Sequence, residues 1–181
     1  NRALCNNTTG NSNTATGKNA LKANTTGQNN TANGLSALSS NTTGAYNTAM
    51  GYGAGGVNTS GESNTSIGYY SGGVNTTGNY NTYIGQQADA AAGLVDLSNS
   101  TAIGYNAKVT ASNQIMLGTA TETVIAPGQV DICGNLYAQY DIANPTIPAG
   151  AIIGGVGSNH FTGDVSMNNN LQVFEHVTIN P

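Results

Sequence analysis

A seventeen-residue repeat dominates the first half of this chain. Six of its positions recur five times in the order Asn, Thr, Gly, then Asn, Thr, Gly again. A fixed period of this size indicates one small unit stacked on copies of itself, rather than a closed globule. The repeated Asn and Gly residues, which we expect to be structural, are Asn7, Gly10, Asn13, Gly17, Asn24, Gly27, Asn30, Gly34, Asn41, Gly44, Asn47, Gly51, Asn58, Gly61, Asn64, Gly68, Asn75, Gly78, Asn81 and Gly85.

The residue types within each repeat favour β-structure. Gly adopts positive φ at little cost and Asn is the next best residue there, so the two glycines predict two corners per coil. The short runs between corners are compatible with strands, whereas Gly, Asn and Thr at this density disfavour helix. We therefore predict an all-β fold, a parallel β-roll or β-solenoid of 17-residue coils over residues 1–118, with a loop insertion at 89–98.

One row of the repeat changes character along the chain. The residue before the second glycine is Thr16, then Asn33, Met50, Ile67 and Ile84. If this row faces inward, the core becomes more hydrophobic toward the C-terminal coils. The expected core is otherwise thin, because most inward candidates are Ala, Thr or Val.

A six-residue period replaces the seventeen-residue one after Gly118. Apolar residues alternate with polar ones over 119–144 and again over 158–181, which is the pattern of half-buried strands. We predict two thin hexad-repeat β-fibre segments there, with a joint at 145–157 that contains Pro145 and Pro148. The chain begins inside a repeat and ends without a capping segment, so we interpret it as a piece of a longer protein or a processed product.

Such coils need stabilisation beyond their small side chains. The area that each coil buries barely offsets the entropy of ordering it. Asn side chains could form hydrogen-bonded ladders along the stack, as in other stacked-strand structures. Alternatively, several copies could pack their apolar faces around a common axis. The sequence leaves both solutions open.

Charge excludes several classes of partner. Only 7% of residues are charged, the net charge is -4, and the four basic residues are Arg2, Lys18, Lys22 and Lys108. A nucleic-acid backbone needs a track of Lys and Arg, so we expect no nucleic-acid partner. No apolar run is long enough for a membrane span, so we expect no membrane insertion.

The sequence lacks the residues of an active site, and we predict that the protein is not an enzyme and needs no cofactor. A Ser or Thr nucleophile requires a base, and the two histidines, His160 and His176, are interpreted as surface or packing residues. As an alternative, one His from each of three chains could bind a metal ion on an axis. Asp89 and Asp96 lack the alternating acids of a calcium loop, and Cys5 and Cys133 form no disulfide framework.

Tyrosines gather in the middle coils and are candidates for binding. The candidates are Tyr46, Tyr52, Tyr69 and Tyr70. If exposed, these rings could stack on sugars or contact a receptor. Packing over adjacent coils or between chains is the alternative.

Two stretches resemble known fibre proteins. The unit Asn-Thr-Thr-Gly-x-x-Asn-Thr-Ala-x-Gly and residues 99–104, Asn-Ser-Thr-Ala-Ile-Gly, resemble head repeats of trimeric autotransporter adhesins. Residues 163–168, Gly-Asp-Val-Ser-Met-Asn, and Leu171-Gln-Val resemble repeats in fibre and spike proteins of large DNA viruses of the algal-virus type, and Asn-Thr-Gly repeats also occur in phage fibres. The resemblances imply a left-handed β-roll and a homotrimer.

We therefore predict a structural fibre or spike protein at a virion surface. Its partners would be further copies of itself, other virion or cell-surface proteins, and a host surface glycan or receptor. The alternative is a trimeric autotransporter adhesin head at a bacterial cell surface. A less favoured alternative is an ice-binding solenoid, whose ladder would be Thr8, Thr25, Thr42, Thr59 and Thr76.

Overall fold

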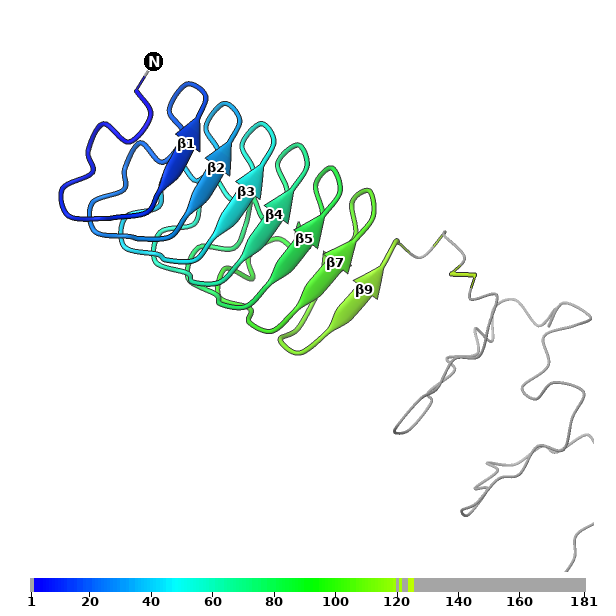
Figure 1. Cartoon of the computed structure of the whole chain (residues 1–181). Helices are drawn as coiled ribbons and strands as arrows, with labels where there is room; N and C mark the ends of the chain where they lie inside the picture. Colours follow the sequence, from blue (N-terminus) through cyan, green and yellow to red (C-terminus); the bar gives the residue numbers. More distant parts are fainter. Residues whose placement is uncertain (1, 120, 122–123, 126–181) are drawn as a thin grey trace, which may run out of the picture. The chain divides into compact units, whose positions relative to one another are not determined.

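The computed structural model describes residues 2–119, 121 and 124–125, which form a parallel β-solenoid of about six turns (Figure 1). Seven short strands stack into one parallel sheet in the order β1-β2-β3-β4-β5-β7-β9. Two further strands, β6 (Asp89–Ala90) and β8 (Lys108–Val109), pair in a second sheet. The strands of the first sheet are β1 (Thr14–Thr16), β2 (Thr31–Asn33), β3 (Thr48–Met50), β4 (Thr65–Ile67), β5 (Thr82–Ile84), β7 (Thr101–Ile103) and β9 (Ile115–Leu117).

The predicted all-β solenoid of 17-residue coils is confirmed. Strand pairing aligns residues seventeen apart, so Thr14 lies beside Thr31 and Ala15 beside Ala32. Between β5 and β7 the repeat is two residues longer, and Thr82 pairs with Thr101, nineteen residues on. The register of the sheet is kept because the extra residues lie outside the strands. We therefore speak of a column for residues that occupy the same position in successive coils.

The core lies behind the middle residue of each strand. Side chains alternate along a strand, and the middle residue of these three-residue strands is the buried one, as at Ala32 and Ala49. The row that ends in Met50, Ile67 and Ile84 follows the middle residue and faces outward; Met50 is 45% exposed. The inward orientation considered for this row is therefore wrong, because the strand places Ala, Ser or Tyr inside instead.

Two clusters fill the core, one at each end of the described coils. The N-terminal cluster is built on Leu21 and Leu38 among alanines, whereas the C-terminal cluster is built on Tyr83. Gly72, in the turn after β4, belongs to the same column as Leu21 and Leu38. A Cβ atom on Gly72 would lie 3.1 Å from Cδ2 of Tyr83. Loss of volume at this glycine thus makes room for the Tyr83 ring, which is fully buried.

Asparagine side chains join the coils at their corners. In the first ladder, Nδ2 of Asn24 donates to Oδ1 of Asn7 at 2.7 Å, and Nδ2 of Asn41 donates to Oδ1 of Asn24 at 2.9 Å. In the second ladder, the backbone N–H of each asparagine donates to Oδ1 of the asparagine one coil earlier, as from Asn47 to Asn30 at 2.9 Å. Buried amide groups need such partners, so the ladders satisfy the polar corners of the stack.

The remaining predicted segments lie almost entirely outside the described residues. This applies to the hexad segments at 119–144 and 158–181, to the joint at 145–157, and to His160, His176 and Cys133. Among the residues that are described, no helix is long and apolar enough to cross a membrane.

Candidate functional site

The repeated asparagines and glycines form the frame of the solenoid and not a ligand site. Asn24, Asn30 and Asn41 are fully buried. Their side-chain amides are already used: Nδ2 of Asn24 donates to Gly27 O at 2.9 Å, and Nδ2 of Asn30 donates to Gly44 O at 2.9 Å. These polar groups are therefore unavailable to a ligand.

Three of the four candidate tyrosines come together. Tyr52 and Tyr69 stack with their ring centroids 5.4 Å apart, and Tyr70 meets both rings edge-on, at 5.2 Å from Tyr52 and 4.7 Å from Tyr69. All three remain between 42% and 48% exposed. We call these three residues the tyrosine cluster.

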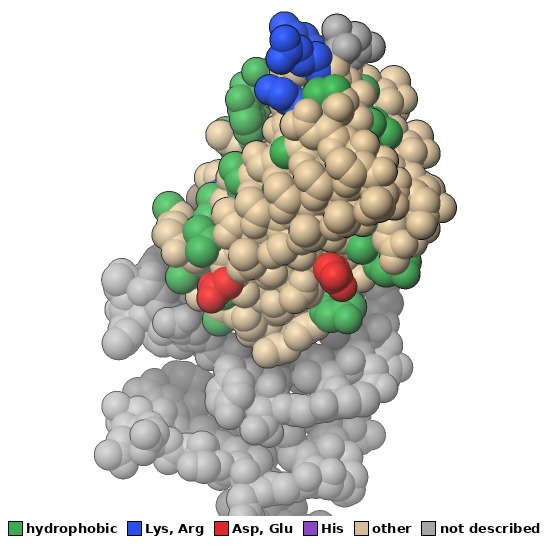
Figure 2. All heavy atoms as spheres, turned by 90° about the vertical axis from the view of Figure 1, so that its left-hand side faces the viewer, with side chains coloured by type: hydrophobic (Ala, Val, Ile, Leu, Met, Phe, Trp, Pro, Cys, Tyr) green, Lys and Arg blue, Asp and Glu red, His purple; other side chains and the backbone are tan. Residues whose placement is uncertain are grey.

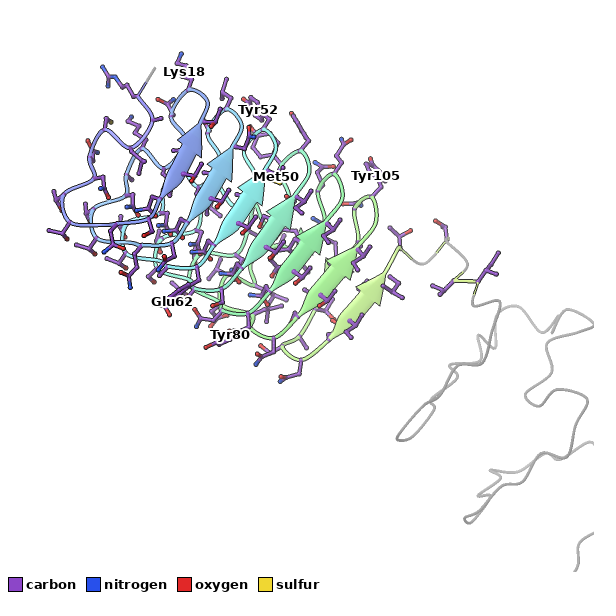
Figure 3. The ribbon with its side chains drawn as sticks, viewed as in Figure 1. Lys18, Met50, Tyr52, Glu62, Tyr80 and Tyr105 are labelled. Atoms are coloured by element: carbon purple, nitrogen blue, oxygen red, sulfur yellow. The ribbon has the colours of Figure 1, made fainter. Side chains whose placement is uncertain are left out.

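The fourth candidate, Tyr46, lies apart from the tyrosine cluster. It precedes β3, whereas Tyr52 follows that strand, so the two belong to opposite edges of the sheet. Tyr46 shares its column with Tyr80, and Figure 3 shows Tyr80 at the edge opposite Tyr52 and Tyr105. The two edges therefore carry separate tyrosines, and any binding role must be assigned to each edge independently.

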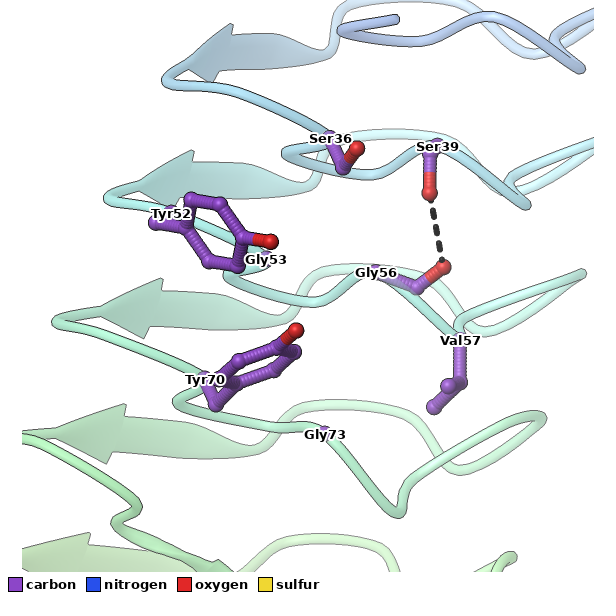
Figure 4. A pocket seen from close by; sticks show the side chains of 8 residues that line it. All are labelled: Ser36, Ser39, Tyr52, Gly53, Gly56, Val57, Tyr70 and Gly73. Atoms are coloured by element: carbon purple, nitrogen blue, oxygen red, sulfur yellow. Dashed lines mark hydrogen bonds between the residues drawn. The ribbon is translucent and has the colours of Figure 1, made fainter.

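A shallow hollow opens beside the tyrosine cluster (Figure 4). Its volume is about 280 Å³. In Figure 4 the hydroxyls of Tyr52 and Tyr70 point toward the side where Ser39 and Gly56 lie. The lining residues are Ser36, Ser39, Tyr52, Gly53, Gly56, Val57, Tyr70 and Gly73.

Residues of two columns line the hollow. Ser36, Gly53 and Tyr70 are successive members of one column, and Ser39, Gly56 and Gly73 are successive members of another. A Cβ atom on Gly53 would lie 2.7 Å from Cε1 of Tyr70, so the Tyr70 ring lies over the space that the missing side chain leaves. The hollow therefore depends on a glycine directly below a tyrosine in the stack.

The lining of the hollow combines apolar and polar groups and is uncharged. None of its eight residues is acidic or basic. The phenol of Tyr70 is neutral at physiological pH, as a tyrosine ordinarily is, and the neighbouring Tyr52 hydroxyl raises its pKa further. Ser39 Oγ donates to Gly56 O at 3.2 Å and keeps its own lone pairs as acceptors. The hollow thus offers rings and hydroxyls, without a charge.

Charged side chains are few on the face that Figure 2 shows. The face consists mostly of uncharged polar and backbone atoms, with Lys and Arg gathered at one end, separate acidic side chains away from that end, and apolar side chains toward the edges. The described bases of the first coils are Arg2, Lys18 and Lys22. The middle coils, which hold the tyrosine cluster, contain no basic residue between Lys22 and Lys108.

An apolar row runs along the outer face of the large sheet. Parallel pairing sets its members side by side, from Met50 to Ile67 and from Ile84 to Ile103 and Leu117. Met50, Ile103 and Leu117 are 40–45% exposed. We call Met50, Ile67, Ile84, Ile103 and Leu117 the apolar ridge.

A buried acid lies in the second sheet, at the first residue of β6. Asp89 is 3% exposed, and loss of solvent raises its pKa to about 6 although the N–H of Ala90 donates to Oδ1 at 2.8 Å and Lys108 opposes the rise. The hydroxyl of Tyr83 is buried without a hydrogen-bond partner, and burial raises its pKa. Both groups are closed off from solvent, so we interpret them as core residues rather than as an active site.

The described residues contain no candidate metal site. Over the described residues, no group of three His, Cys, Asp or Glu side chains could hold a metal ion, and Cys5 is an exposed free thiol. The alternative of a metal bound by histidines on an axis concerns His160 and His176, which lie outside those residues.

The sequence alone indicated the tyrosines but not the hollow. Ser36, Ser39, Gly53, Gly56 and Gly73 were not singled out as site residues. The signal was present in the seventeen-residue spacing, which places Gly53 under Tyr70 in one column. Alignment of residues seventeen apart places the residues that line the hollow in neighbouring coils.

Comparison with known proteins finds no relative of this chain. No family model, no curated protein and no solved structure matches the chain. The resemblances to adhesin heads and viral fibres therefore remain predictions.

Proposed function

We propose that this chain is a structural segment of a surface fibre, and that it assembles as a homotrimer through the apolar ridge. The observation that carries the proposal is the ridge itself. Its residues lie in parallel register on the outer face of the sheet and continue over five strands, β3, β4, β5, β7 and β9. Scattered apolar residues need no explanation, but a contiguous row of exposed and half-buried apolar residues indicates an interaction surface.

The geometry of the ridge suits association between copies. Burying apolar area contributes roughly 25 cal/mol per Å², and a straight row along a rod can bury its whole length only against an equally long row. A second and third copy of the same rod provide such rows, with a closed symmetry. The number three comes from the resemblance to trimeric adhesin heads and not from the ridge.

The proposed place of the fibre is a virion surface, where it would present a host-attachment surface. The described coils support a scaffolding role because their buried polar groups are used for stacking and their ionisable groups form no active site. A trimeric adhesin head at a bacterial surface uses the same architecture and remains the alternative. The neighbouring sequence in the gene separates the two: further fibre repeats support the virus, and a C-terminal membrane anchor contradicts it.

Sedimentation of variants tests the assembly. The wild-type chain should sediment as an elongated particle of about 55 kDa, three chains of 18.2 kDa each. Ile67→Asn with Ile84→Asn should sediment as a monomer with an intact fold, because Asn33 already occupies this row in β2. Tyr46→Asn with Tyr80→Asn is the matched control and should remain trimeric, since Asn29 and Asn99 occupy that column. A monomeric wild type contradicts the proposal.

An ice-binding role is a second candidate, because a threonine column occupies the same sheet face. Thr31, Thr48 and Thr65 lie in parallel register, and Thr14, Thr82 and Thr101 extend the column. The ladder expected from Thr8 and Thr25 is less suitable, since its hydroxyls donate to carbonyls of the next coil, at 2.8 Å for Thr8. A thermal-hysteresis assay decides: activity in a monomeric sample supports ice binding and contradicts the fibre.

A further inference from the structure

We propose that the hollow beside the tyrosine cluster is a binding site for one ring of a neutral saccharide. This inference deepens the attachment role proposed above and rests on it, since it names the ligand class and the residues that would recognise it. The site lies in the turns after β2, β3 and β4, whereas the apolar ridge lies on the outer face of the sheet. The two surfaces can therefore be tested separately.

The aromatic side of the hollow suits the apolar face of a sugar. Tyr52 and Tyr70 line the hollow, and Tyr69, which does not line it, packs against both rings with centroid distances of 4.7–5.4 Å within the cluster. Tyrosine offers a large contact area together with a hydroxyl at little cost in conformational freedom. A preformed aromatic wall of this kind favours a ligand that is flat and apolar on one side.

The serines that line the hollow suit sugar hydroxyls. Ser36 and Ser39 supply hydroxyl groups that can donate and accept. The Ser36 hydroxyl makes no hydrogen bond to another described residue, and the Ser39 hydroxyl retains its acceptor lone pairs while it donates to Gly56. A lining that combines aromatic rings with hydroxyl groups matches the apolar and polar parts of a pyranose.

The hollow has about the size of one sugar ring. Three of its lining residues, Gly53, Gly56 and Gly73, contribute only backbone atoms. Its volume of about 280 Å³ is near the lower end of ligand pockets, which hold about 300–1,000 Å³. One sugar ring of a longer chain fits this size better than a large apolar molecule does.

Charge decides the class of saccharide. The eight lining residues contain no base, and no basic residue occurs between Lys22 and Lys108. A sulfated or sialylated glycan would lose the hydration of its anionic group without gaining a partner. A neutral hexose or N-acetylhexosamine avoids this cost, so we commit to neutral glycans.

Binding to immobilised glycans tests the site. The probes are oligosaccharides ending in neutral hexoses or N-acetylhexosamines, with sialylated and sulfated oligosaccharides beside them. Wild-type protein should bind at least one neutral probe. Tyr70→Ser and Tyr69→Gln should bind it about tenfold more weakly or worse, and both replacements already occur in their columns, at Ser36 and Gln86. Tyr80→Asn, on the other edge, should bind like the wild type.

A glycine variant tests the geometry without touching an aromatic residue. Gly53→Ser places a Cβ atom where the Tyr70 ring now lies, and Ser36 shows that a serine is accommodated in this column at a φ of 60°. The ring must move, so affinity for the neutral probe should fall while the fold persists. Unchanged affinity in this variant would overturn the proposed geometry.

The outcomes separate this inference from the fibre proposal. If the protein sediments as a trimer but binds no neutral probe, or binds acidic probes alone, the saccharide site is contradicted. The fibre proposal then still stands. Binding that is lost in Tyr70→Ser but kept in Tyr80→Asn supports the site even if the protein is monomeric, in which case only the fibre is contradicted. Binding that survives both Tyr70→Ser and Tyr69→Gln also overturns the site.

Discussion

The side-chain amides of Asn13 and Asn24 donate to one and the same oxygen, the carbonyl of Gly27, at 2.7 and 2.9 Å. The two asparagines belong to neighbouring coils and to different ladders. A carbonyl oxygen has two lone pairs, and this arrangement uses both. The same convergence recurs at Gly44, which accepts from Asn30 and Asn41 at 2.9 Å each. The glycine carbonyls are thus the points at which the ladders join.

Removing a ladder asparagine from the middle of the stack should destabilise the fold. Asn41 donates to Asn24 and Gly44 and accepts from Asn58, and it is fully buried. Asn41→Ala should lower the free energy of unfolding by about 2–4 kcal/mol, since unsatisfied buried partners remain. Denaturant unfolding measures this change. Asn7→Ala, at the end of the ladder and only partly buried, is the control; an equal loss there would refute the ladder as the source.

Adding a methyl group at a corner glycine should be more damaging than adding one in the insertion. A Cβ atom on Gly44 would clash with Oδ1 of Asn41 and with the backbone oxygen of Gly61. A Cβ atom on Gly93 would meet nothing within 4 Å, and there only the positive φ of 87° opposes a side chain. Gly44→Ala should therefore unfold at a clearly lower temperature than Gly93→Ala by circular dichroism. The opposite order would contradict the close stacking of coils.

Loss of the buried tyrosine hydroxyl should stabilise the protein. The Tyr83 hydroxyl is buried without a hydrogen-bond partner, and burial of such a group costs about 1–3 kcal/mol. Tyr83→Phe should raise the free energy of unfolding by a part of that cost. Tyr80→Phe, on a residue that is 64% exposed, should change little. Marked destabilisation of Tyr83→Phe would show that the hydroxyl has a partner after all.

The buried acid should make stability depend on pH. Desolvation raises the pKa of Asp89 to about 6, above its ordinary value of 3.8. The folded state therefore holds a proton that the unfolded state releases between these two values, and stability should fall as the pH rises from about 4 to 7. The contribution is on the order of 2–3 kcal/mol.

Thermal melting at a series of pH values isolates this term. Asp89→Asn should show a flatter dependence of melting temperature on pH than the wild type, whatever its absolute stability. The other acids are present in both proteins and cancel in the comparison. Parallel pH profiles for the two proteins would mean that Asp89 titrates normally.

The sequence predicted the solenoid because its strongest constraints are local and repeated. Asn24 and Gly27 stand at the same place in every coil, and stacking them in register satisfies the same hydrogen bonds each time. Whether the side chains of Met50 and Ile67 point inward or outward was harder to predict. A three-residue strand is too short for alternation of polar and apolar residues to distinguish its two sides. Their apolar character suggested the core, whereas the structure places them on the outer face.

The candidate site was predicted only in part, for a related reason. Tyr69 and Tyr70 are neighbours in sequence, but their contacts with Tyr52 depend on the seventeen-residue column and on the glycine beneath Tyr70. Tyr46 lies on the other edge of the sheet. Composition identifies the residue type, and the register between coils decides which tyrosines meet.

Distances between spin labels on separate chains test the ridge-mediated assembly most directly. The label is attached at Ile84→Cys on the ridge or at Tyr80→Cys on the sheet edge, each with Cys5→Ser and Cys133→Ser. If three ridges pack around one axis, the interchain distance from residue 84 is clearly shorter than that from residue 80. Absence of interchain coupling at residue 84, or a shorter distance at residue 80, contradicts the account.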